Sequence, residues 1–214
     1  MIRSTPPQVT PERIALRGPA GSIEAVLEDP GVAGDAYAVV CHPHPLFGGT
    51  MENKVVTTLA RALHACAIPT LRFNFRGVER SEGSFDGGGG ETDDALAVAD
   101  WGATHWPRRQ LVVAGFSFGA YVALRLAQRR AVRRLILVAP PVGRFDFSAL
   151  SAPGAPWVVI QGDADEVVDP LAVSGWAQAS SPAPELLMMT GVGHFFHGRL
   201  TDLRDAVVGE IRSA

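Results

Sequence analysis

The feature that most constrains this 214-residue chain is the stretch around Ser117, where an apolar run passes into a helical pattern without a linker. Residues 111–114 are all apolar, as expected of a strand that is covered on both faces of a parallel sheet. The pentapeptide G-F-S-F-G follows, and apolar residues then recur at helical spacing. A strand that becomes a helix within one or two residues strains its central residue, and only small neighbours such as Gly115 and Gly119 tolerate this. The segment therefore predicts a serine exposed on a sharp turn at a helix N-terminus, where negative charge is favoured.

The pentapeptide has two interpretations, and its flanking residues decide between them. On its own, G-x-S-x-G is also typical of a glycine-rich turn that a serine caps. A buried strand before it and an amphipathic helix after it are the context in which such a serine acts as a nucleophile. The context therefore favours a catalytic role for Ser117.

Composition and charge narrow the class of protein. With 47% hydrophobic and 19% charged residues, residues 1–214 are predicted to form one globular domain. The net charge of −3 and the lack of a basic stripe argue against a nucleic-acid partner, and no apolar run is long enough to span a membrane. The stretch 1–12 is polar and is predicted not to be a signal peptide. Two cysteines, Cys41 and Cys66, are too few for a disulfide framework, so we expect a cytoplasmic protein.

Apolar strands alternate with amphipathic helices along most of the chain. The strands are expected over 14–16, 23–27, 36–41, 68–75, 111–114, 135–138, 157–161 and 186–190. The helices are expected over 51–65 with Thr50 as cap, over 91–106, from within the pentapeptide onward, over 171–179 and over 200–212, with loops over 81–90 and 140–154. This alternation predicts the α/β class, with a mostly parallel, doubly wound sheet and helices on both faces.

A serine hydroxyl needs a base within hydrogen-bond reach, and the base gains from a carboxylate that orients it. In a doubly wound sheet such groups gather at the carboxyl ends of the strands. Two loops that follow expected strands carry side chains of these types: Asp163, Asp165, Glu166 and Asp169 in one, His194 and His197 in the other. The order along the chain is then serine, acid, histidine, which is the order in α/β-hydrolases.

From about Ile23 to Arg212 the chain resembles the α/β-hydrolases, and among them the small bacterial serine hydrolases grouped with dienelactone hydrolases and carboxylesterases. The motifs that carry the resemblance are H-P-H-P-L-F-G-G-T (42–50), G-F-S-F-G (115–119), G-D-A-D-E-V-V (162–168) and G-V-G-H-F-F (191–196). The resemblance implies a nucleophile elbow at Ser117, Asp165 as the acid and His194 as the base. Asp163 is the second candidate for the acid and His197 for the base. The other acidic side chains are expected to form turns or to be solvated.

Acyl transfer also needs N–H donors for the oxyanion of the transition state. One is expected at Phe118, the residue after the nucleophile, and the other in the loop after the strand 36–41. Both prolines of the H-P-H-P run lack an N–H, which leaves His44 and Leu46. Alignment of His42 with the leading histidine of the family's H-G-x pattern favours His44, with Leu46 second. The side chain of His42 is expected to make structural hydrogen bonds.

No metal or cofactor is expected. The four histidines of the two loops lack the acidic ligands and the helical H-E-x-x-H pattern of metallohydrolases. The acidic loop lacks the glycine of a calcium loop, and the glycines at 87–90 lack the G-K-S/T ending of a phosphate loop.

The expected activity is that of a serine hydrolase acting on a small-molecule ester or related acyl substrate. The interval 139–156 is too short for a cap domain, so an open site without a lid is expected. The alternatives are an acyltransferase, a thioesterase or a peptidase with the same triad, or a non-catalytic binding module on the same scaffold. Six aromatic residues are candidates either for an apolar acyl pocket or for the core: Phe47, Phe116, Phe118, Phe145, Phe195 and Phe196. Substrate identity and oligomeric state stay open.

Overall fold

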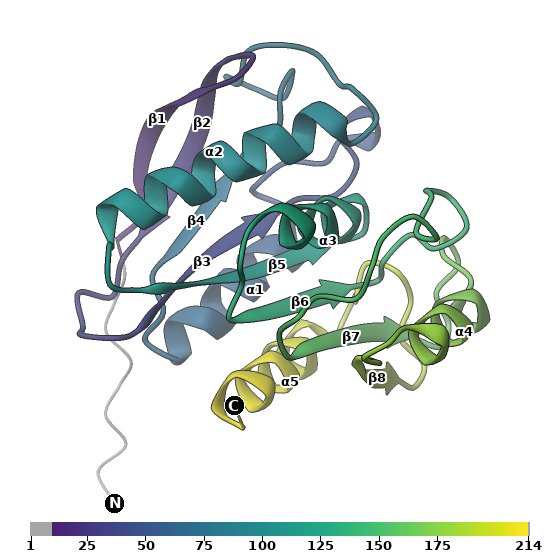
Figure 1. Cartoon of the computed structure of the whole chain (residues 1–214). Coiled ribbons are helices and arrows are strands. Elements are labelled where there is room, and N and C mark those ends of the chain that lie inside the picture. The colour runs from purple at the N-terminus through teal and green to yellow at the C-terminus, as the bar shows by residue number, and fades with distance from the viewer. Residues whose placement is uncertain (1–9, 214) are drawn as a thin grey trace, which may run out of the picture.

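The structure, a computed structural model, describes residues 10–213 of the chain. Within these residues, eight strands form one sheet in the order β1-β2-β4-β3-β5-β6-β7-β8 (Figure 1). The strands are β1 (Glu12–Gly18), β2 (Gly21–Glu28), β3 (Ala36–Cys41), β4 (Thr70–Phe73), β5 (Gln110–Phe116), β6 (Arg134–Val138), β7 (Trp157–Gly162) and β8 (Glu185–Met189). Strand β2 pairs antiparallel with β1 and β4, and all pairs from β4 to β8 are parallel. The predicted mostly parallel α/β sheet is therefore confirmed.

Helices cover both faces of this sheet, as Figure 1 shows. They are α1 (Lys54–Ala65), α2 (Gly89–His105), α3 (Phe118–Arg129), α4 (Pro170–Ala179) and α5 (Leu200–Arg212). Side chains of α2, α3 and α4 share one buried apolar cluster, and those of α1 and α5 share the other. In β5, Leu111 and Val113 face the first cluster, whereas Val112 and Ala114 face the second. This two-sided burial is why the strand reads as a continuous apolar run.

The predicted start of the first helix is wrong. We expect Thr50 to cap it, whereas α1 begins later with Asn53 as its cap, whose side chain accepts a hydrogen bond from a backbone N–H of the first turn. The residue Met51 is instead held by tertiary contacts. Its N–H donates to Asn74 Oδ1 at 2.9 Å, and its carbonyl accepts from Arg72 Nη1 at 2.7 Å. These bonds fix the chain before the helix, which local capping preference does not foresee.

Among the other boundaries that differ from expectation, two have a clear cause in the structure. Strand β4 ends before Asn74, earlier than the predicted end at 75, because Phe75 turns its N–H to His42 Nε2 at 3.0 Å. The glycines at 87–90 do not all lie in a loop, since Gly88 caps α2 and the two that follow form its first turn. A Cβ on Gly90 would lie 1.9 Å from Arg76 Nη1, so close packing explains a glycine inside this helix.

Residues 1–9, most of the stretch predicted not to be a signal peptide, lie outside the described part of the chain. Among residues 10–213, no helix combines the length and the apolar character that crossing a bilayer requires. Between β6 and β7 the chain has no helix, only turns and an isolated bridge. The open arrangement expected from this short interval is therefore present in the fold.

Candidate active site

The turn between β5 and α3 holds Ser117 in an unusual backbone conformation, with φ of 54° and ψ of −121°. The two glycines of the pentapeptide explain how the turn packs. A Cβ on Gly115 would lie 2.1 Å from the carbonyl oxygen of Gly119, and one on Gly119 would lie 2.3 Å from that of Cys41. Both distances are far below van der Waals contact, so these positions exclude any side chain. The elbow is therefore seated directly on the end of β3.

We expect Gly119→Ala to destabilise the protein by about 1–3 kcal/mol, because the added methyl group has no space against the backbone of β3. Gly209→Ala is a matched control. Gly209 lies within α5, and a Cβ there meets nothing within 4 Å, so the same substitution should raise stability by about 0.5–1 kcal/mol. Urea unfolding of the two variants measures both effects, and equal signs would contradict the packing argument.

Three side chains from three loops form a continuous hydrogen-bonded chain. His194 Nε2 lies 3.1 Å from Ser117 Oγ, and His194 Nδ1 lies 2.8 Å from Asp165 Oδ2. His194 is 2% exposed and Asp165 is 9% exposed, so water competes little with these contacts. The structure thus brings together the predicted nucleophile, base and acid. His197 is not part of this series of hydrogen bonds, since it is exposed and its ring stacks on Phe195.

The carboxylate of Asp165 is surrounded by donors. Its Oδ1 accepts hydrogen bonds from the N–H groups of Val167 and Val168, both at 2.8 Å, and its Oδ2 accepts from Gln161 Nε2 at 2.9 Å besides His194. Burial opposes ionisation here, but the hydrogen bonds from His194, Val168 and Gln161 outweigh it and hold the pKa of Asp165 below its usual value. The group is therefore a carboxylate that can orient and stabilise the imidazole.

Two other acidic residues position the histidine loop. Asp163 Oδ1 accepts from the N–H of Gly191 at 2.7 Å, and Glu166 Oε2 accepts from the N–H of His194 at 3.2 Å. A Cβ on Gly193 would lie 2.8 Å from that same Glu166 oxygen, so a side chain at this position would displace the Glu166 carboxylate. The sequence makes Asp163 the second candidate for the acid and predicts that Glu166 forms a turn or is solvated. The structure shows instead that they tie the acid loop to the backbone of the histidine loop.

Gln161 is a polar residue that sequence reasoning missed. It is fully buried near the end of β7, and its side chain donates to Asp165 as described above. The one signal in the sequence is a long polar side chain that ends an apolar strand just before the acidic loop.

His42 has a structural place, because both of its ring nitrogens have backbone partners. Nε2 accepts from the N–H of Phe75 at 3.0 Å, so Nδ1 carries the proton and donates to the carbonyl of Pro43 at 2.6 Å. Complete burial lowers the pKa of His42 to about 3, although the bond to Pro43 opposes this. A neutral imidazole therefore holds the start of the loop after β3.

The candidate oxyanion donors differ in what their N–H groups do. The N–H of Leu46 donates to His44 Nδ1 at 3.2 Å, within a short 3₁₀ turn (Pro45–Phe47). Phe118 is the first residue of α3. Among the described residues, no hydrogen-bond acceptor contacts its N–H or that of His44. The hydrogen-bonding pattern thus favours His44 over Leu46 as the second donor.

Aromatic rings flank the reacting groups on two sides. The ring of His44 packs on Phe47 and Phe85 with centroids 4.8 Å away, and on Phe118 at 5.0 Å. On the other side, His194 lies between Phe116 at 5.1 Å and Phe195 at 5.0 Å.

Exposure divides the six phenylalanines considered for an acyl pocket. Phe116, Phe118 and Phe196 are buried in the core, whereas Phe145 is half-buried. Phe47 is 86% exposed and Phe195 is 43% exposed, so these two can contact a substrate directly. The exposed apolar surface near the elbow comes from loops, not from a cap.

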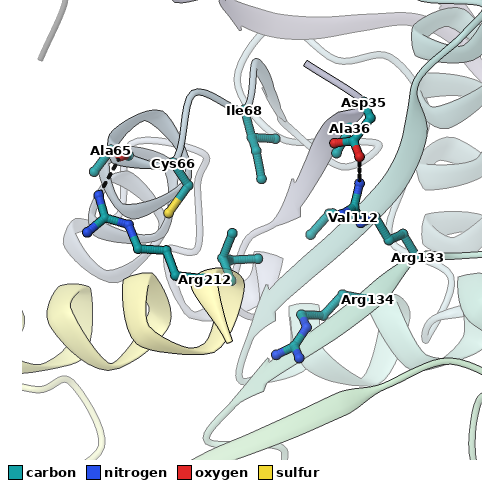
Figure 2. A pocket seen from close by; sticks show the side chains of 10 residues that line it. Asp35, Ala36, Ala65, Cys66, Ile68, Val112, Arg133, Arg134 and Arg212 are labelled. Atoms are coloured by element: carbon teal, nitrogen blue, oxygen red, sulfur yellow. Dashed lines mark hydrogen bonds and ion pairs between the residues drawn. The ribbon is translucent and has the colours of Figure 1, made fainter. Parts of the chain in front are cut away.

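A separate cavity of about 390 Å³ lies at the amino ends of the parallel strands (Figure 2). Its lining includes Cys66, Arg133 and Arg212, of which Arg133 pairs with Asp35 and Arg212 donates to a carbonyl at the end of α1. Ser117 lies beyond the opposite, carboxyl edge of the sheet, where catalytic groups of this architecture gather. This cavity is therefore distinct from the candidate active site.

Comparison with known proteins identifies the family. No protein-family model matches the chain. A lid-less α/β serine hydrolase of Xanthomonas campestris is 48% identical, with a TM-score of 0.90 over 95% of this chain and 94% of its own. A serine hydrolase homologue of Coxiella burnetii is 44% identical, with a TM-score of 0.90 over 93% of this chain and 96% of its own. An uncharacterized protein of Rickettsia prowazekii is 35% identical over an alignment of 205 residues that covers 91% of this chain and 86% of that protein. On these grounds the chain belongs to the α/β serine hydrolases that lack a lid.

Proposed function

We propose that the protein cleaves small carboxylic esters through a Ser117–His194–Asp165 triad and an acyl-enzyme. The observation that carries this proposal is the unbroken hydrogen-bonded chain from Ser117 Oγ through His194 to Asp165 Oδ2. Family membership supports a hydrolase, and the geometry supports the assignment of roles within it.

In the first half-reaction, Ser117 Oγ attacks the ester carbonyl while its proton passes to His194 Nε2. The tetrahedral intermediate places negative charge on the former carbonyl oxygen, which the N–H groups of Phe118 and His44 stabilise. Collapse of the intermediate breaks the bond to the alcohol, and His194 returns the proton to the leaving oxygen. Asp165 stays ionised throughout and stabilises the imidazolium.

In the second half-reaction, water replaces the alcohol. His194 accepts a proton from the water as its oxygen attacks the acyl carbon. The bond to Ser117 Oγ then breaks, the proton returns to the serine, and the carboxylic acid leaves. Both half-reactions rely on the contact between Ser117 Oγ and His194 Nε2 that is present in the structure.

The surroundings of the elbow favour a small, apolar substrate. The exposed rings of Phe47 and Phe195 pack on His44 and His194, and the segment between β6 and β7 contains no helix that could cover them. An apolar acyl or alcohol group can contact these rings, but a long chain would stay largely in water. We therefore propose short acyl esters as the substrate class.

A fluorophosphonate probe and a panel of aryl esters test this function together. We expect one labelled residue, Ser117, located by mass spectrometry of the digested protein, and faster turnover of short than of long acyl chains. Lactones, thioesters and an added alcohol acceptor in the same assay distinguish a lactonase, a thioesterase and an acyltransferase. Absence of both labelling and turnover would favour a non-catalytic binding protein.

A further inference from the structure

Gln161 occupies an environment in which a polar side chain has a cost. It is 0% exposed in β7, following three valine and isoleucine residues that are also fully buried. Its Nε2 donates to Asp165 Oδ2 at 2.9 Å and to the carbonyl of Gly162 at 3.1 Å. Both partners are acceptors, so the amide orientation is unambiguous. Among the described residues, its Oε1 is buried without a hydrogen-bond partner.

The unpartnered oxygen indicates what the amide group contributes. A buried acceptor without a partner destabilises the fold, and an apolar side chain of the same size would avoid that loss. The hydrogen bond from the Gln161 amide N–H to Asp165 is the contribution that compensates for this loss of stability. That N–H shares Oδ2 with His194 Nδ1, whereas Oδ1 is occupied by two backbone N–H groups.

We propose that Gln161 is a positioning residue that fixes the carboxylate of Asp165 and, by sharing Oδ2, sets the strength of its hydrogen bond to His194. This inference rests on the proposed triad. Removing the amide leaves Oδ2 with one donor fewer, so this oxygen carries more uncompensated negative charge. It should then hold the imidazole proton more strongly and favour the imidazolium.

Few other charged groups reach this carboxylate. In the acid loop, Glu166 is engaged with the N–H of His194, and Asp163 with the histidine loop. From the loop between β6 and β7, Arg144 donates to the carbonyl of Val167 and not to Asp165. His194 is the charged group that faces Asp165 from the histidine loop.

Gln161→Leu and Gln161→Met test this role, the second preserving side-chain length if the first folds poorly. We expect kcat/KM for a short aryl ester to fall about tenfold, as when groups behind metal-bound histidines are removed. The acid limb of the pH profile of kcat/KM should move up by about 0.5–1 pH unit. The downfield ¹H resonance of His194 Nδ1–H should move further downfield.

Thr70→Val is the matched control. Thr70 is fully buried, its hydroxyl contacts His64 Nε2 at 2.8 Å, and it lies at the amino edge of the sheet. We expect this variant to lose stability without moving either the acid limb or the resonance.

If the Gln161 variants behave like Thr70→Val, Gln161 only packs the core and the proposal is wrong. The resonance is measured without substrate, so its shift supports the role of Gln161 even if no ester is hydrolysed. A failure of ester turnover in the native protein would instead count against the proposed function.

Discussion

Ser117→Ala is expected to lower kcat/KM for aryl esters by about 10⁶-fold, to a residual rate due to binding and the oxyanion donors. The substitution removes the atom that would attack the carbonyl and leaves the turn intact. The positive φ at this position strains alanine about as much as serine, and Gly115 and Gly119 are unchanged. Ester turnover and fluorophosphonate labelling measure the loss, and urea unfolding confirms that the variant is folded.

Ser174→Ala on α4 is the control, because it removes a serine hydroxyl whose partner is Gln178 and leaves the site intact. It should keep native turnover and native labelling. Turnover by Ser117→Ala at the native rate would show that the hydrogen-bonded Ser117, His194 and Asp165 do not carry out the catalysis.

Those parts of the fold that depend on local periodicity were predictable from the sequence. Strand β3 and helix α5 have the predicted bounds, because β3 is a continuous run of buried apolar residues and α5 buries residues at helical spacing, such as Leu203 and Val207. The start of α1 was not predictable, because Met51 is held by Asn74, which directly follows β4. The glycine at position 90, near the start of α2, is explained by the guanidinium of Arg76 that packs against it.

The candidate site shows the same division. Loop positions after strands indicated which side chains can meet, since the carboxyl ends of parallel strands share one edge. The residues that hold the acid and the base in place could not be predicted from the sequence. Glu166 and Gln161 act through hydrogen bonds that connect one loop to another loop or to a strand. A solvated glutamate and one that holds a backbone N–H have the same sequence pattern. The geometry of neighbouring loops separates them.

The choice of His44 as oxyanion donor shows how the structure refines an open alternative. Two prolines left His44 and Leu46 as chemical possibilities, and the sequence contains nothing about what each N–H contacts. In the structure the N–H of Leu46 is already used by the ring of His44. A donor with no acceptor before substrate binds needs no rearrangement when negative charge develops, which favours His44.

His194→Ala should lower kcat/KM about as much as Ser117→Ala, by about 10⁶-fold, because within residues 10–213 no other base forms a hydrogen bond with the serine hydroxyl. The double variant should be no slower than either single variant, since two groups that act as one unit cannot be lost twice. The residual rate should also lose the acid limb of its pH profile. His197→Ala is the control, because this exposed ring packs on Phe195 outside the hydrogen-bonded chain, and it should keep native turnover. If the losses in the double variant added up, Ser117 and His194 would be acting in separate steps, and the proton transfer proposed here would be wrong.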